Sequence, residues 1–78
     1  MQTYTLVEVT KNPADGEEVY HYRSPEGDVK FQADPKNAWC WLTYSKTSTA
    51  PKKSWTKVID AYVKAMIETQ ETPTTVTI

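Results

Sequence analysis

The sequence has few of the residues that hold small folds together by covalent bonds or metal ions. Among its 78 residues it has one cysteine, Cys40, and one histidine, His21. One cysteine cannot form an intrachain disulfide, and a structural zinc site needs four cysteine or histidine ligands. Small secreted domains usually depend on several disulfides, so this composition favours a reducing compartment and a cytoplasmic protein.

Long apolar runs and glycine-rich loops are missing as well. No apolar stretch approaches the roughly 20 residues that span a bilayer, and no cationic segment followed by an apolar one opens the chain. The two glycines, Gly16 and Gly27, both have turn residues as neighbours, so a glycine-rich phosphate-binding loop is not expected. We therefore expect a soluble protein without a membrane segment, a metal ion or a cofactor.

An excess of charge of one sign is also lacking. The 9 Lys and Arg face 10 Asp and Glu, a formal net charge of -1, which argues against a basic nucleic-acid tail and an acidic mimic of DNA. A chain this short buries only about 60% of its unfolded surface. We therefore expect one domain, residues 1–78, with a modest core, and this size argues against a multi-step enzyme.

The N-terminal half alternates apolar and polar residues in the manner of β-strands, with proline- and glycine-containing turns between the alternating segments. In the first segment, alternation places Tyr4 and Leu6 on one face of the strand. Val7 and Val9 should then lie on the other face. The predicted strands are residues 3–10, 18–23 and 28–33.

Residues 54–70 carry the clearest helical signal. Apolar side chains recur at helical spacing on one face of this segment, and charged side chains gather on the opposite face. Ser54 is predicted to cap the helix, and Pro73 ends it. Residues 74–78 are predicted to form a short final strand.

Residues 37–44 fit a helix or a strand. Asp34 as a cap and Pro35 at the first helical position favour a helix, whereas on a strand Trp39 and Trp41 would share one face. With the helix preferred, the element order is βββααβ. The predicted fold is an α+β two-layer sandwich, in which one long and one short helix pack on a three- to four-stranded, mainly antiparallel sheet.

His21 and Cys40 are the only candidates for a catalytic base and nucleophile, and no third group that would orient them can be identified. A packing role for His21 and a small buried hydrophobic role for Cys40 explain both residues. We therefore expect no enzymatic activity and no catalytic residue.

Charge divides unevenly along the chain. Residues 1–34 carry seven acidic and three basic residues, a net -4, and residues 35–78 carry six lysines and three acidic residues, a net +3. Residues 35–59 contain five of these lysines, no acidic residue and all three tryptophans. Lysines interleaved with aromatic rings are typical of contact surfaces. The predicted partner-binding residues are Trp41, Tyr44, Lys46, Lys52, Lys53 and Lys57.

The favoured function is a non-enzymatic interaction protein that binds and regulates or inhibits another macromolecule. A protein partner is preferred, because tryptophan and tyrosine anchor protein interfaces. The first strand or residues 74–78 could also accept a strand from a partner. Small cytosolic chains of this kind are often carried by bacteriophages or other mobile elements and act on a host protein.

Two alternatives remain open. The first is weak, sequence-tolerant binding of single-stranded nucleic acid or RNA by residues 36–57, because lysine lacks the planar fork that reads bases. The second is a homodimer in which exposed aromatic side chains pack against a second copy. The core position expected for Trp55 and a solvated linker at Lys52 and Lys53 would argue against the contact surface.

Overall fold

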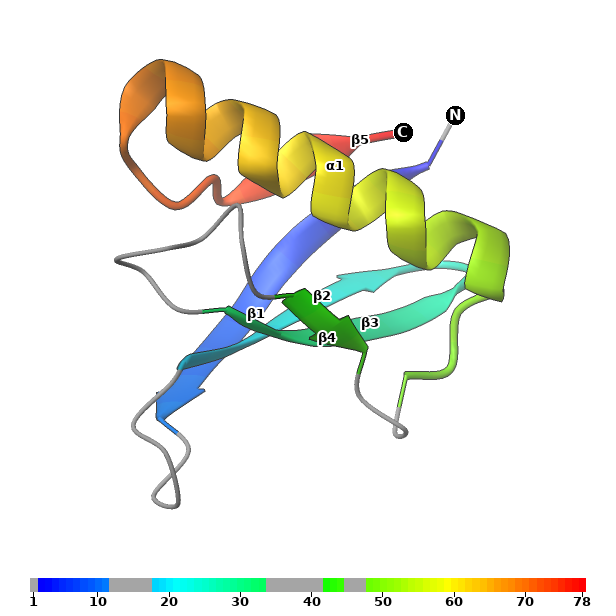
Figure 1. Ribbon diagram of the computed structural model, residues 1–78. Helices are drawn as coiled ribbons and strands as arrows, with labels where there is room; N and C mark the ends of the chain where they lie inside the picture. Colours follow the sequence, from blue (N-terminus) through cyan, green and yellow to red (C-terminus); the bar gives the residue numbers. More distant parts are fainter. Residues whose placement is uncertain (1, 12–17, 34–41, 45–47) are drawn as a thin grey trace.

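The computed structural model describes residues 2–11, 18–33, 42–44 and 48–78, which form one antiparallel sheet and one helix (Figure 1). The elements are β1 (Thr3–Lys11), β2 (Glu18–Ser24), β3 (Gly27–Ala33), β4 (Leu42–Tyr44), α1 (Lys52–Thr69) and β5 (Thr75–Thr77). The strand order is β4-β3-β2-β1-β5, and all neighbouring strands run antiparallel. The predicted α+β class is confirmed.

The three predicted strands form a meander, as their alternation indicated. Tyr20 and Tyr22 of β2 lie opposite Phe31 and Val29 of β3, and all four side chains are buried. Residues opposite each other in an antiparallel pair share a face, so these four side chains form one apolar surface on the sheet. The polar residues between them point to the other face.

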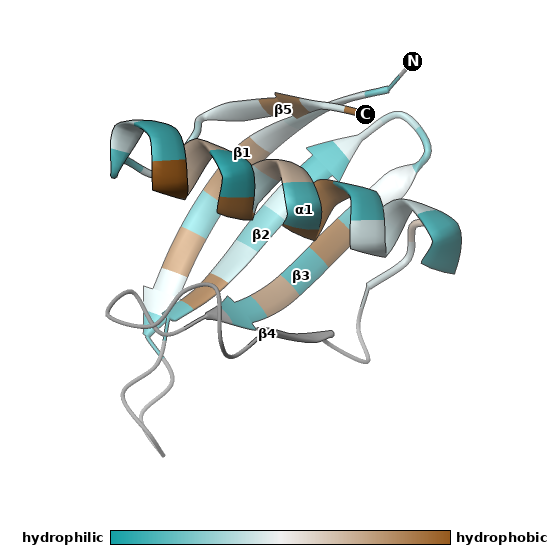
Figure 2. Cartoon of the chain, turned by 45° about the horizontal axis from the view of Figure 1, so that its top comes forward, coloured by the Kyte–Doolittle hydropathy of each residue, from teal (hydrophilic) through white to brown (hydrophobic). Residues whose placement is uncertain are grey.

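α1 covers the apolar face of the sheet, and the core lies between these two layers. Figure 2 shows the hydrophobic side of α1 facing the strands, and Val58, Ile59 and Tyr62 of the helix are buried there. The Phe31 ring stacks on Tyr22, with ring centroids 5.8 Å apart, and meets Tyr62 edge-on at 5.0 Å. Aromatic rings in these arrangements stabilise a core beyond the area they bury.

α1 begins before the predicted start, and the prediction that Ser54 caps it is wrong. Pro51 precedes the first helical residue, and no described side chain caps the helix. Ser54 is buried in the first turn, where its hydroxyl bonds to Glu26 instead. At the other end, Gln70 adopts a left-handed φ of 59°, and its N–H donates to the Met66 carbonyl oxygen at 2.9 Å. No helix in the described part of the chain combines the length and the hydropathy needed to cross a membrane.

Residues 42–44, the end of the region predicted as a short second helix, form a strand instead. β4 pairs with the end of β3, with Tyr44 opposite Phe31. The cap signal at Asp34 is local, whereas the edge of β3 offers backbone hydrogen bonds along its length, and a short helix is marginal by itself. The predicted order is therefore matched only in part: the described elements run ββββαβ, and their sheet has five strands instead of three or four. Residues 34–41 of the predicted helical region lie outside the described residues.

Candidate interaction surface

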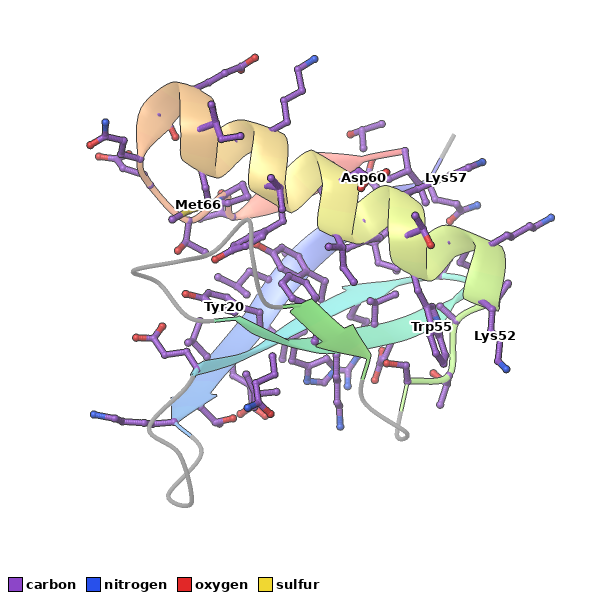
Figure 3. All side chains as sticks on the ribbon, viewed as in Figure 1. Tyr20, Lys52, Trp55, Lys57, Asp60 and Met66 are labelled. Carbon is purple, nitrogen blue, oxygen red and sulfur yellow. The ribbon has the colours of Figure 1, made fainter. Side chains whose placement is uncertain are left out.

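Three of the six predicted contact residues lie together at the start of α1. Lys52, Lys53 and Lys57 are exposed, and Figure 3 shows Lys52 and Lys57 extending outward from the helix. Lys52 and Lys53 belong to the helix and not to a linker, because α1 begins at Lys52. Positive side chains in the first turn are unfavourable beside the positive end of a helix dipole, so this arrangement needs a compensating charge.

That charge is the carboxylate of Glu26, in the turn between β2 and β3. Its Oε1 accepts hydrogen bonds from Tyr4 Oη at 2.7 Å and from Ser54 Oγ at 2.8 Å. These two hydrogen bonds, followed by the charges of Lys53 and Lys57, hold the pKa of Glu26 below its usual value. Glu26 therefore neutralises part of the positive charge at the start of α1.

The aromatic part of the predicted surface is not brought to these lysines by the described residues. Trp41 and Lys46 lie outside the described residues, and Tyr44 is placed only through the backbone of β4. Trp55 is partly buried against the core, as expected, and its Nε1–H donates to the Ala50 carbonyl oxygen at 2.7 Å. Lys52, Lys53 and Lys57 thus lie together on the surface, and a partner contact by any of the six residues stays a prediction.

The sheet face opposite α1 carries charged side chains that pair with one another. His21 is only 7% exposed, with Nε2 3.0 Å from Asp28 Oδ2 and Nδ1 3.8 Å from Glu8 Oε1. Arg23 donates to both carboxylate oxygens of Asp28, at 3.0 and 3.3 Å. The Arg23 guanidinium, and then His21, hold the pKa of Asp28 below its usual value.

This pairing limits what the open face can do chemically. Arg23 and Asp28 already neutralise each other, so this pair presents little net charge to an ionic ligand. The described part of the chain also contains no group of three or more His, Cys, Asp or Glu side chains that could hold a metal ion. His21 is buried and lies opposite Lys30 of β3.

Along its second half, β1 has an outer edge that pairs with no described residue. β5 pairs with residues 3–5 of β1, and beyond them the Leu6 N–H donates to the Thr74 carbonyl oxygen at 2.8 Å. Farther along, no described residue pairs with the outer side of residues 7–11, and β1 runs on past the end of β5 (Figure 1). We call this unpaired edge of residues 7–11 the β1 notch.

Backbone groups in the notch point toward the open edge. The Lys30 N–H donates to the Ser48 hydroxyl and therefore points away from β2. His21, which lies opposite Lys30, consequently directs its own N–H and C=O groups to β1, where they lie opposite Glu8. Alternation from Glu8 then directs the N–H and C=O groups of Val9 and Lys11 to the open side. The notch therefore presents the hydrogen-bonding groups to which a further strand would pair.

A β-bulge at Val7 changes which residues of β1 face the helix. The register with β2 shifts between Leu6 and Glu8, which leaves Val7 as the extra residue. After it, Val9 lies opposite the buried Tyr20, on the helix side of the sheet. The prediction that Val9 faces away from Leu6 is therefore wrong, because the alternation does not continue through the bulge. Val7 and Val9 remain 45% and 42% exposed, so the notch is apolar as well as unpaired.

Sequence reasoning named the first strand and residues 74–78 as edges for strand addition but could not choose between them. The choice follows from strand lengths, since β1 has nine residues and β5 has three. Exposed valines in a strand next to charged residues are the only local signal of the notch. Comparison of the chain with protein-family models, curated proteins and solved structures gives no significant match.

Proposed function

We propose that this chain is a non-enzymatic interaction protein that binds, and thereby regulates or inhibits, another protein. The observation that supports the proposal is the β1 notch, in which edge-facing backbone groups lie beside the exposed Val7 and Val9. An extended segment of a partner that pairs there would satisfy the backbone groups and cover the two valines. A partner segment held in this sheet is withheld from its other ligands, and this is the regulatory effect.

A photoreactive amino acid at Val9 tests the proposal. Ile67, an apolar residue of α1 that is 60% exposed, is the matched control position. In a lysate of the producing organism, we expect the probe at Val9 to cross-link to one protein, with or without nuclease, and the probe at Ile67 to cross-link to none. No cross-link at Val9, or the same cross-link at both positions, would contradict the proposal.

Single-stranded nucleic acid or RNA is the second candidate partner, and the exposed Lys52, Lys53 and Lys57 favour it. Glu26 offsets part of their charge, and lysines contact phosphates without reading sequence, so binding would be weak and sequence-tolerant. Affinity for a single-stranded oligonucleotide should fall steeply between low and physiological salt, and Lys52→Ala with Lys53→Ala should abolish it. Absence of binding at low salt in a fluorescence anisotropy titration would remove this candidate.

A further inference from the structure

We infer that a second copy of this chain fills the β1 notch when no other partner is bound, with the two β1 strands paired antiparallel about Val9. The inference rests on the proposed function, because it assigns an occupant to the same edge. Residues 7–11 are both the wall of one notch and a strand of the right length to fill another. In a dimer with one two-fold axis, each copy therefore fills the notch of the other.

The direction of the backbone groups restricts the register. Val9 faces the edge, so it must lie opposite an edge-facing residue of the second copy. With Val9 on the axis, Glu8 lies opposite Thr10. Moving the axis to Glu8 would put two carboxylates directly opposite each other, which is unfavourable. Moving it to Thr10 would shorten the overlap of the two β1 strands.

The side chains of the notch fit this register. The two Val9 side chains lie next to each other at the axis. The exposed fraction of the Val9 side chain, 42% in the single chain, decreases in both copies. The two five-stranded sheets then form one continuous sheet.

Sedimentation equilibrium between about 10 µM and about 1 mM tests the inference. We expect the mass to double with concentration. Val9→Lys puts two ammonium groups opposite each other and should weaken self-association about tenfold or more. Ile67→Lys makes the same kind of change at an exposed position on α1 and should leave self-association unchanged. A mass that stays monomeric, or a dimer that Val9→Lys leaves intact, overturns the inference.

Amide exchange gives a second readout that does not depend on a variant. The Val9 N–H should exchange more slowly as the dimer forms, whereas the Thr10 N–H, which faces β2, should not change. Equal slowing of both amides would overturn the pairing. A monomeric chain whose Val9 probe captures another protein supports the proposed function and overturns this inference. A chain that dimerises through Val9, and whose Val9 probe cross-links only to a second copy, supports this inference and overturns the proposed function.

Discussion

Gly27→Ala should destabilise this protein strongly, although the substitution adds only one methyl group. Gly27 begins β3 with a φ of +138°, which L-residues rarely adopt. A Cβ at this position would lie 2.8 Å from the backbone nitrogen of Ala50 and 2.9 Å from its Cα. Because these atoms belong to the backbone, no side-chain rotation can relieve the contact, and the segment at Ala50 would have to move.

The expected loss follows from two contributions. The strained backbone conformation costs about 1–3 kcal/mol. Displacing the segment breaks the hydrogen bonds from the N–H groups of Thr49 and Ala50 to the Asp28 carbonyl oxygen, at 2.9 and 3.0 Å, each worth about 1 kcal/mol. The sum is about 3–5 kcal/mol, whereas a domain of 78 residues has a free energy of unfolding of about 4–12 kcal/mol. Gly27→Ala should therefore be close to the limit of folding.

Urea denaturation followed by far-ultraviolet circular dichroism measures this loss. Pro25→Ala is the matched control, since Pro25 is exposed in the same turn, and it should change the free energy of unfolding by less than about 1 kcal/mol. If Gly27→Ala also costs less than about 1 kcal/mol, the close approach of the two segments does not govern stability and the reasoning fails.

Three further predictions concern titratable and hydroxyl groups. Because hydrogen bonds from Tyr4 and Ser54 lower the pKa of Glu26, its contribution is present above about pH 4.3 and is lost as pH falls through the lowered value. The urea midpoint should drop less between neutral pH and about pH 3 in Glu26→Gln than in the natural chain, and an equal drop would contradict this. Burial raises the pKa of Tyr22 and Tyr62, so only the unfolded state ionises them near pH 10. Stability should therefore fall above about pH 10, and tyrosinate absorbance of these residues that precedes the loss of circular dichroism would refute the shift. The Tyr62 hydroxyl is buried, and no described residue lies in good hydrogen-bond geometry to it, whereas the Tyr22 hydroxyl donates to a backbone carbonyl oxygen at 2.7 Å. Tyr62→Phe should be neutral or stabilising by up to about 1 kcal/mol, and Tyr22→Phe should be destabilising by about 1 kcal/mol. Thermal denaturation in which Tyr62→Phe lowers the melting temperature more than Tyr22→Phe does would contradict this prediction.

The meander and the long helix were predictable because their signals are local. Alternation predicted the strands at residues 18–23 and 28–33, and the side chains that form the apolar face there, Tyr20, Tyr22, Val29 and Phe31, are all buried. Helical spacing identified the buried side of α1 in the same way. Each of these patterns repeats within a few residues and needs no knowledge of distant contacts.

β4, the cap and the notch were not predictable in this way because they depend on pairing between distant residues. Leu42–Tyr44 became a strand through the edge of β3, against a local helix signal. Ser54 looked like a cap, but its hydroxyl is taken by Glu26 from a turn 28 positions away. The bulge at Val7 is visible only in the register with β2, so the face and exposure of Val9 could not be derived from alternation.

The pairing of β1 with β5 also governs the order in which the molecule assembles. Gln2 and Ile78 exchange two backbone hydrogen bonds, at 3.2 and 2.9 Å, and the neighbouring Thr3 and Thr77 are 74 positions apart in the chain. Closing so large a loop costs more conformational entropy than forming the β-hairpins, so β5 should join the sheet after the meander. A short peptide linking Gln2 to Ile78 would remove most of that closure cost. A circularly permuted chain opened elsewhere would then refold faster than the natural order.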